Sequence, residues 1–266
     1  MTESERDATS TPGVPERGRP AGEGTVTTEP EPPARVLSIH AHPDDQEFTV
    51  AGTLAKWARA GSAIVSVCIT SGHAGSNKYT PPEMTREALA PIRQAEQRAA
   101  CRLLGVGEVV FLDYEDGVLE PSIALRRDLT RLIRRYRPDA VVCGDPTVRY
   151  YGRSYLNHPD HRVAADVTLD AVFPSAETRL IFPELLDEGL LPHHVGAVFI
   201  HGAERPDTWV DITETLAVKV AALREHKSQM GEWDPEEMLT EWAREQGVPR
   251  RLGAAEAFRV MVLDGD

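Results

Sequence analysis

The chain has 266 residues and a formal net charge of −13. This length suits one large α/β domain or two small ones. The acidic balance argues against a general nucleic-acid-binding protein, which needs a basic surface, and against docking on anionic lipid. No apolar run approaches the roughly 18 residues that a membrane-spanning helix requires, and the pattern of a secretory signal is missing.

Residues 1–33 have the composition of a disordered leader. Six prolines and four glycines fall among Ser, Thr and Glu there, with almost no large apolar side chain. Such a segment cannot bury enough surface to offset the entropy lost on ordering. We therefore expect one folded α/β domain over residues 34–266.

From residue 35 onward, short apolar runs alternate with longer segments of helical periodicity. The apolar runs predict buried strands at Arg35–His40, Ala63–Ile69, Val109–Leu112 and Ala140–Cys143. The periodic segments between them predict helices at Val50–Ala60, Glu87–Leu104 and Ser122–Tyr136. This alternation predicts a mostly parallel sheet covered by helices on both faces, a three-layer α/β/α fold.

The last third of the chain has a less regular pattern. Val195–Ile200 is typical of a further strand, and Ile212–Lys227 is typical of a helix. The final apolar stretch, Ala257–Leu263, fits no element clearly. The three cysteines form no CxxC pair, which favours buried thiols in a reducing, cytoplasmic compartment: Cys68, Cys101 and Cys143.

Two short clusters of histidine and carboxylate residues follow predicted strands. The first is His42-Pro43-Asp44-Asp45-Gln46-Glu47, and the second is His158-Pro159-Asp160-His161. In an open parallel sheet, ligands gather beyond the carboxyl ends of the strands. Both clusters are therefore expected on one rim of the sheet, where they would form a shared site.

The residue types in these clusters suit a metal hydrolase. A catalytic zinc usually takes three ligands from His, Asp and Glu and keeps one position open. His42 and Asp45 lie three residues apart across a tight loop, and His161 would complete the set. Zinc lowers the pKa of a bound water from 15.7 to about 7. Other divalent metals accept the same ligands.

Three further residues of the clusters have predicted catalytic roles. Asp44 is a free carboxylate beside a ligand and can accept the proton of the attacking water. His158 can stabilise an oxyanion or protonate a leaving amine. Asp160 would hold the ring of His158 and favour its charged form.

These motifs resemble those of the PIG-L/LmbE-like zinc-dependent de-N-acetylases. The likeness extends to segments outside the two clusters and covers roughly residues 35–230: Phe111–Gly117, Tyr136–Val142, Val210–Thr213 and His226–Gln229. It implies a Rossmann-like fold and the same residue roles: zinc on His42, Asp45 and His161, Asp44 as base, and His158 at the oxyanion. Some members place a tyrosine just before the second motif, where this chain has Leu156-Asn157.

The resemblance implies a hydrolase that removes the acetyl group of an N-acetylated amino sugar or glycoside. A related amidase or hydratase acting on a non-sugar substrate, such as a thiol conjugate, stays open. A non-catalytic α/β binding module is the alternative of another class. A nucleotide-binding domain is rejected, because two aspartates stand where a phosphate-binding glycine loop would be.

Weaker candidates for substrate contact surround the predicted rim: His73, Arg93, Asp116 and His226. Arg93 and Glu96 also have the spacing of a solvated ion pair on a helix, which is the simpler interpretation. His226 is equally compatible with a packed helix residue. His40 is interpreted as a buried strand-end residue.

Overall fold

The computed structural model describes residues 29–263. Most of the predicted leader, residues 1–28, lies outside this range. The strands are β1 (Arg35–His40), β2 (Ala63–Thr70), β3 (Glu108–Tyr114), β4 (Ala140–Gly144), β5 (Tyr150–Tyr151), β6 (Tyr155–Leu156), β7 (Ala197–His201), β8 (Thr208–Asp211) and β9 (Ala255–Val262).

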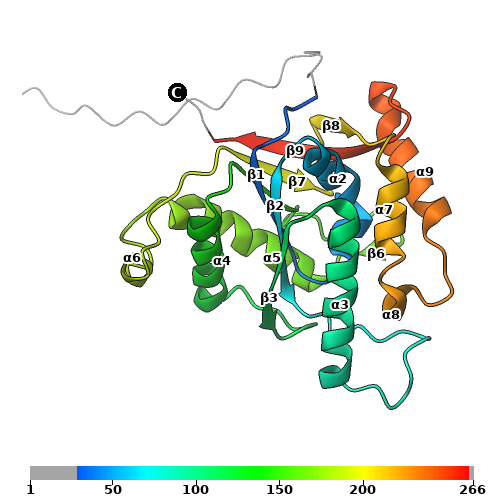
Figure 1. Cartoon of the computed structure of the whole chain (residues 1–266), viewed down its shortest axis with the longest axis horizontal. Coiled ribbons are helices and arrows are strands. Elements are labelled where there is room, and N and C mark those ends of the chain that lie inside the picture. The colour runs from blue at the N-terminus through cyan, green and yellow to red at the C-terminus, as the bar shows by residue number, and fades with distance from the viewer. Residues whose placement is uncertain (1–28, 264–266) are drawn as a thin grey trace, which may run out of the picture.

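The helices largely alternate with these strands (Figure 1). They are α1 (Asp45–Thr49), α2 (Ala51–Arg59), α3 (Arg86–Leu104), α4 (Ile123–Tyr136), α5 (Pro159–Asp170), α6 (Glu184–Asp187), α7 (Leu216–Leu223), α8 (Lys227–Met230) and α9 (Glu236–Gly247). A short π-helix, Ala171–Ala176, follows α5, and a 3-10 turn, Val248–Arg250, follows α9. None of the helices in residues 29–263 combines the length and the apolar character needed to cross a bilayer.

Seven strands form one sheet in the order β3-β2-β1-β4-β7-β9-β8. The five strands from β3 to β7 pair in parallel, whereas β9 runs antiparallel to both β7 and β8. The sheet is therefore mostly parallel, as predicted. The final apolar stretch, unassigned from sequence, is an inner strand of this sheet.

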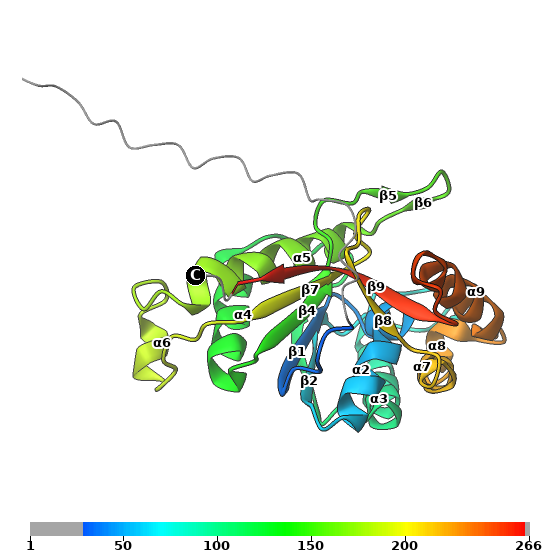
Figure 2. The same ribbon diagram turned by 90° about the horizontal axis from the view of Figure 1, so that it is seen from above.

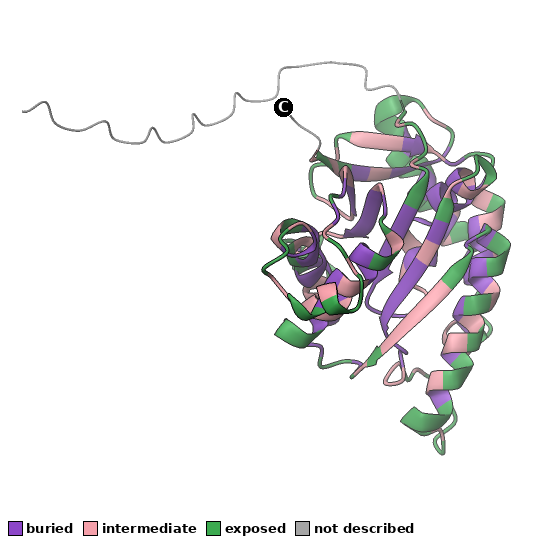
Figure 3. Ribbon diagram, turned by 60° about the vertical axis from the view of Figure 1, so that its left-hand side comes forward, coloured by how far each residue is buried: buried purple, intermediate pink, exposed green. Residues whose placement is uncertain are grey.

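Alternating residues of each strand face opposite layers of helices, which is the period expected of a strand buried on both faces. On one face, Val36 packs in a cluster with residues of α2, α3, α7 and α9. On the other face, Leu37 packs in a cluster with residues of α4, α5 and the π-helix. Figure 2 shows these two layers on either side of the sheet, and Figure 3 shows the inner strands buried between them.

Local sequence signals set several element boundaries. Thr85 and Ser122 cap α3 and α4, each accepting a hydrogen bond from a backbone N–H in the first helical turn. Gly105 ends α3 with φ of 79°, a left-handed conformation that glycine adopts without strain. The single helix predicted at Ile212–Lys227 is wrong, because the structure has two short helices, α7 and α8, separated at Arg224–His226.

Candidate active site

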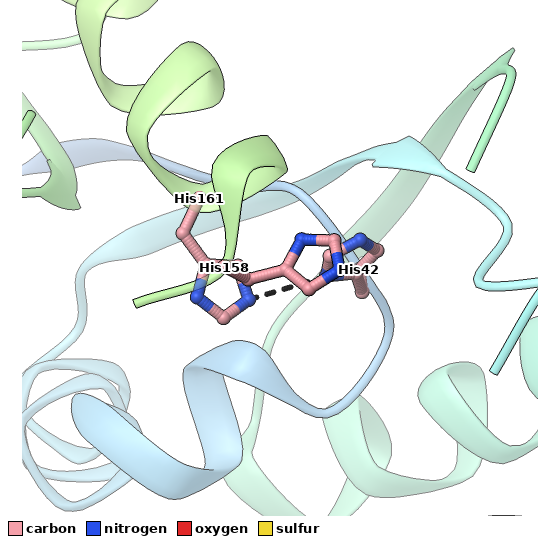
Figure 4. A group of neighbouring side chains, drawn as sticks. All are labelled: His42, His158 and His161. Atoms are coloured by element: carbon pink, nitrogen blue, oxygen red, sulfur yellow. Dashed lines mark hydrogen bonds between the residues drawn. The ribbon is translucent and has the colours of Figure 1, made fainter. Parts of the chain in front are cut away.

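The two predicted clusters meet at one end of the sheet. His42 lies in the loop that follows β1, and His158 and His161 lie at the start of α5. The Nδ1 atom of His42 and the Nε2 atom of His161 are 3.2 Å apart, and the three imidazoles converge (Figure 4). Segments more than 110 residues apart in sequence therefore share one site.

The side chains of His42, Asp45 and His161 bring two ring nitrogens and both oxygens of a carboxylate close together. Asp45 Oδ1 lies 3.0 Å from His161 Nε2, and Asp45 Oδ2 lies 3.5 Å from His42 Nδ1. Ligands about 2.0–2.2 Å from a tetrahedral zinc would lie about 3.3–3.6 Å from one another. The contacts of 3.0–3.5 Å among these three residues, two of them to different oxygens of Asp45, lie near this range.

The other nitrogen of His42 faces two carboxylates. Its Nε2 atom lies 3.0 Å from Asp116 Oδ1 and 3.3 Å from Asp160 Oδ2. A proton on Nε2 can be donated to these carboxylates, which leaves the lone pair of Nδ1 free for a cation. By spacing alone, two groups of side chains could hold a cation: His42 with Asp116 and Asp160, and His42 with His158 and His161.

Asp160 does not hold the ring of His158 as its position in the motif suggested. Its carboxylate accepts hydrogen bonds from the backbone N–H groups of Gly117 and Leu119 and faces His42. The nearest carboxylate oxygen is 3.8 Å from His158 Nδ1. The reason is geometric: Asp160 lies in the first turn of α5 and points inward, whereas His158 is the N-cap residue.

His158 is arranged as a neutral hydrogen-bond donor. Its Nδ1 atom accepts a hydrogen bond of 3.1 Å from the backbone N–H of Asp160, so the proton is on Nε2. Burial, reinforced by the nearby charge of His42, lowers the pKa of His158 below its ordinary value. This environment disfavours the charged form that the sequence interpretation assigned to His158.

Asp44 is held in an unusual backbone conformation. Its φ is 90°, in the left-handed region that few residues other than glycine adopt. Its backbone N–H donates to Gln97 Oε1 at 2.9 Å, and its carboxylate lies 2.9 Å from a guanidinium nitrogen of Arg93. Burial raises the pKa of Asp44 although the Arg93 charge lowers it, which makes the carboxylate a better proton acceptor.

Arg93 is a buried structural residue, so its interpretation as a solvated partner of Glu96 is wrong. Its guanidinium also donates to the carbonyls of Pro43 and Gly72, at 2.6 and 2.7 Å. Glu96 instead accepts hydrogen bonds from the backbone and side chain of Ser228. Arg93 thus fixes the loop that carries Asp44, while still lining the site.

Two other substrate candidates lie away from the cavity surface. His226 is fully buried, with Nε2 3.4 Å from a carboxylate oxygen of the equally buried Glu47, so the prediction of a substrate contact is wrong. The sequence was equally compatible with a packed residue, although His226 precedes α8 and does not lie within a helix. His73 lies 3.5 Å from Glu115 and is not among the residues that line the cavity. His40 is buried and stacks on His201, as expected of a strand-end residue.

Negative charge exceeds positive charge around the ligand atoms. Burial lowers the pKa of His42, but the carboxylates of Asp45, Asp116 and Asp160 outweigh it and raise that pKa well above its ordinary value. Despite its burial, Asp45 has a pKa well below the usual range, chiefly through the charges of His161 and His42. The donor set therefore favours a bound cation, and His/Asp ligands suit a divalent transition metal.

A cavity of about 1100 Å³ opens over these residues. Asp44, His158 and Asp116 line its floor, and Tyr151 and Tyr155 of the β5–β6 hairpin line one wall. No role is predicted for these tyrosines from the sequence. A two-residue strand pair is too short to leave a periodic signal.

Two supporting residues were missed by sequence reasoning. The Oδ1 atom of Asn157 accepts a hydrogen bond of 3.1 Å from the Nδ1–H of His161, which orients that ring with Nε2 toward Asp45. Its position directly before the second motif is the only local signal. Gln97 holds both Asp44 and Glu47, and it lies on the inward face of α3 one turn beyond Arg93. A polar residue on a buried helix face was the available signal there.

Comparison with known proteins identifies the family. Residues 37–172 match the model of the family described as PIG-L: GlcNAc-PI de-N-acetylase. A diacetylchitobiose deacetylase of Thermococcus kodakarensis is 32% identical over 206 residues, covering 76% of this chain and 74% of that protein. A 1D-myo-inositol 2-acetamido-2-deoxy-alpha-D-glucopyranoside deacetylase 1 of Saccharopolyspora erythraea is 28% identical, covering 81% and 82%.

A solved structure shares the fold closely. The N,N'-diacetylchitobiose deacetylase from Pyrococcus horikoshii superposes with a TM-score of 0.78 at 32% identity, covering 86% of this chain and 84% of that one. The chain is a member of the PIG-L de-N-acetylase family, a class of metal-dependent deacetylases. The family and the α/β fold predicted from the two motifs are thereby confirmed.

Proposed function

We propose that this protein hydrolyses the acetamide of an N-acetylated amino sugar or glycoside, with a divalent cation held by His42, Asp45 and His161. The observation that carries the proposal is the set of contacts of 3.0–3.5 Å among the side chains of His42, Asp45 and His161, beside the largely buried carboxylate of Asp44. The substrate class follows from the relatives, whose names describe deacetylation of chitobiose and of a glucosaminyl inositol.

Zinc is the proposed cation. Its tetrahedral geometry matches the donor spacing, and three protein ligands leave one position open. When bound, such an ion polarises the amide carbonyl and makes water a stronger nucleophile at neutral pH. Asp116 and Asp160 hold His42 in the tautomer that presents Nδ1, and Asn157 orients His161.

The proposed reaction divides proton transfer and charge stabilisation between two residues. Asp44 accepts a proton from the attacking water and returns it to the leaving nitrogen, so that a free amine and acetate are formed. The Nε2–H of His158 donates a hydrogen bond to the carbonyl oxygen as negative charge develops on it. Arg93 keeps the Asp44 carboxylate in position through the contact at 2.9 Å.

The test compares the wild-type protein with Asp44→Asn. Asparagine has the same shape and tolerates the positive φ of this position, so the variant should fold and retain metal. We expect turnover of N-acetylglucosaminyl substrates, measured as primary-amine release, to fall about 10²–10⁴-fold. Metal content, measured by plasma mass spectrometry, should stay unchanged.

Asp145→Asn is the matched control, because Asp145 lines the same cavity and, within residues 29–263, its side chain hydrogen-bonds only to Thr147. Its turnover should stay near wild type. Near-wild-type turnover by Asp44→Asn would disprove the role of Asp44. Failure of the wild-type protein to release amine from any N-acetylated sugar would overturn the proposed reaction.

A cytoplasmic location belongs to the same proposal. The three cysteines are all free and buried, and no pair of them is cross-linked. Unpaired thiols are typical of proteins in a reducing compartment. Fractionation of cells followed by detection of the protein would test this location.

A further inference from the structure

The cavity continues well beyond the proposed reaction centre. Sites for drug-sized ligands measure about 300–1,000 Å³, so a cavity of about 1100 Å³ exceeds what a single N-acetylated sugar needs. Its lining extends from His42 to a separate wall formed by α9 and β9. Nothing in the proposed chemistry uses this second wall.

The residues that line the cavity come partly from the segment that matches the family model and partly from later residues. The ligands, the base and His158 all lie within residues 37–172. The second wall comes from later residues: Pro206 in the β7–β8 loop, Trp242 and Gln246 on α9, and Ala257 in β9. The proposed reacting centre therefore lies within the segment that matches the family model, whereas the far wall is built by residues that follow it.

Helix α9 carries the indole ring of Trp242 and the side-chain amide of Gln246 on one face. Leu239 and Ala243 face the core and are buried. Trp242 and Gln246 lie one turn apart, so they project from the same face of the helix. Both line the cavity, and the Trp242 side chain is 49% exposed.

The polar groups on this wall have no partners within the described residues. The structure gives no side-chain hydrogen bond or ion pair for Gln246 or for the neighbouring Glu245, which also lines the cavity. An amide offers both donors and an acceptor, and a carboxylate offers acceptors. These groups are free to bind hydroxyls at the edge of a ring stacked on Trp242.

The far wall is held in a fixed relation to the metal ligands. Phe48 of α1, the helix that begins at Asp45, packs against a cluster that includes Leu223 of α7 and Leu239 of α9. Helix α9 also packs on β9. Figure 2 shows α9 beside α7 and α8, on the same side of the molecule. The distance between the two ends of the cavity is thus set by packed elements.

We propose that Trp242, with Gln246 and Glu245, forms a second subsite that binds another polyhydroxylated six-membered ring joined to the N-acetylated sugar. Such rings have an apolar C–H face that can stack on an indole, and hydroxyls around the edge that bind amides and carboxylates. An alkyl chain would leave the carboxylate and amide unused. This subsite rests on the proposed function, which places the acetamide at the opposite end.

The test measures binding and turnover separately. The probes are glucosamine as a single ring and chitobiose as a two-ring product, titrated by calorimetry into the full-length, metal-loaded protein. We expect tighter binding of chitobiose, and an approximately tenfold loss of that preference in Trp242→Ala, because an aromatic stacking partner is removed. Trp242→Phe should restore most of the preference.

Trp233→Ala is the matched control, because Trp233 is 43% exposed and lies outside the cavity lining. It should retain the wild-type preference.

In turnover of N,N'-diacetylchitobiose, Trp242→Ala should raise KM about tenfold and leave kcat unchanged. Gln246→Ala should raise KM less. The same measurement with N-acetylglucosaminyl inositol tests whether the subsite binds a cyclitol as well as a pyranose. A rise in KM in Trp242→Ala with either substrate supports the proposal.

Two results would overturn the subsite. The first is an unchanged preference for two rings in Trp242→Ala. The second is a rise in KM for octyl N-acetylglucosaminide in Trp242→Ala that equals the rise for the two-ring substrates. An alkyl tail would then occupy the site as well as a ring does. If amine is never released but chitobiose binding depends on Trp242, the proposed reaction fails and the subsite stands.

Discussion

The Nε2 atom of His42 lies 3.0 Å from Asp116 Oδ1, and this contact joins a predicted metal ligand to a residue of a different loop. Asp116 is itself fixed by a hydrogen bond of 2.6 Å from the backbone N–H of Ala74. The interaction with His42 lowers the pKa of Asp116 to about 2 despite its burial. A carboxylate in this position sets the tautomer and raises the basicity of the metal-binding nitrogen.

Asp116→Asn should therefore weaken metal binding about 10–100-fold, the usual effect of losing a carboxylate behind a histidine ligand. Competition with a chromophoric chelator measures the dissociation constant. Glu115→Gln is the control, because the Glu115 side chain is 70% exposed and does not contact His42. Equal affinities for the two variants would show that Asp116 does not support the ligand.

Arg93→Ala should lower the free energy of unfolding by about 3 kcal/mol, because it leaves the buried Asp44 carboxylate without its charged partner. Two backbone carbonyls lose their donor in the same variant. Urea denaturation measures the change. Arg102→Ala on the exposed face of the same helix should shift the free energy by less than about 0.5 kcal/mol. Similar losses in both variants would contradict the structural role of Arg93.

The three thiols should be inert in the native protein at pH 8. Burial raises the pKa of Cys101 and of Cys143 to about 12, and it raises the pKa of Cys68 well above its ordinary value. The reactive thiolate is thus scarce. A colorimetric thiol reagent should detect almost no thiol before denaturation and three afterwards. Rapid labelling of one thiol in the native state would contradict this burial.

Stability should fall as the pH drops below about 6.5, in part through His193, which lies far from the proposed metal ligands. Burial lowers the pKa of His193 in the folded state, where its Nε2 atom bonds the carbonyl of Pro138 at 2.8 Å. The unfolded chain therefore binds a proton first as the pH falls, and the free energy of unfolding decreases. At pH values above the ordinary pKa of histidine, His193 is neutral in both the folded and the unfolded chain. It then no longer makes the free energy of unfolding depend on pH.

Urea denaturation at pH 7.5, 6.5 and 5.5 measures this dependence. His193→Gln removes the titrating group but can still donate to Pro138, so its stability should change less over the same interval. An identical slope in the variant and the wild-type protein would show that His193 makes no contribution.

Local sequence signals were sufficient for the first half of the fold. The apolar strands and capped helices up to Gly144 lie close to their predicted positions, because each is determined by its own periodicity and by residues such as Ser122. The meeting of His42 with His161 followed from the rule that parallel strands end on one edge. Their roles as metal ligands stay predictions.

The remaining features depend on contacts that local patterns do not encode. Spacing along α3 suggested that Arg93 pairs with Glu96, but the tertiary structure buries Arg93 against Asp44. Asp160 faces His42 because the loop at Gly117 donates to its carboxylate from a distant part of the chain. The antiparallel placement of β9 is equally non-local, because its partners β7 and β8 precede it with α9 in between.

The position of β9 makes the placement of β8 depend on a strand that comes later in the chain. Among the strands of residues 29–263, β8 pairs with β9 alone, so neither strand can be placed until residues 255–262 have been synthesised. The carboxylate of Glu256 in β9 also accepts the backbone N–H groups of Gly52 and Thr53, at the beginning of α2. The start of α2 therefore lacks this partner until a side chain 204 residues further along the chain has been made. A chain interrupted before β9 would expose both that helix terminus and an open sheet edge to aggregation and proteolysis.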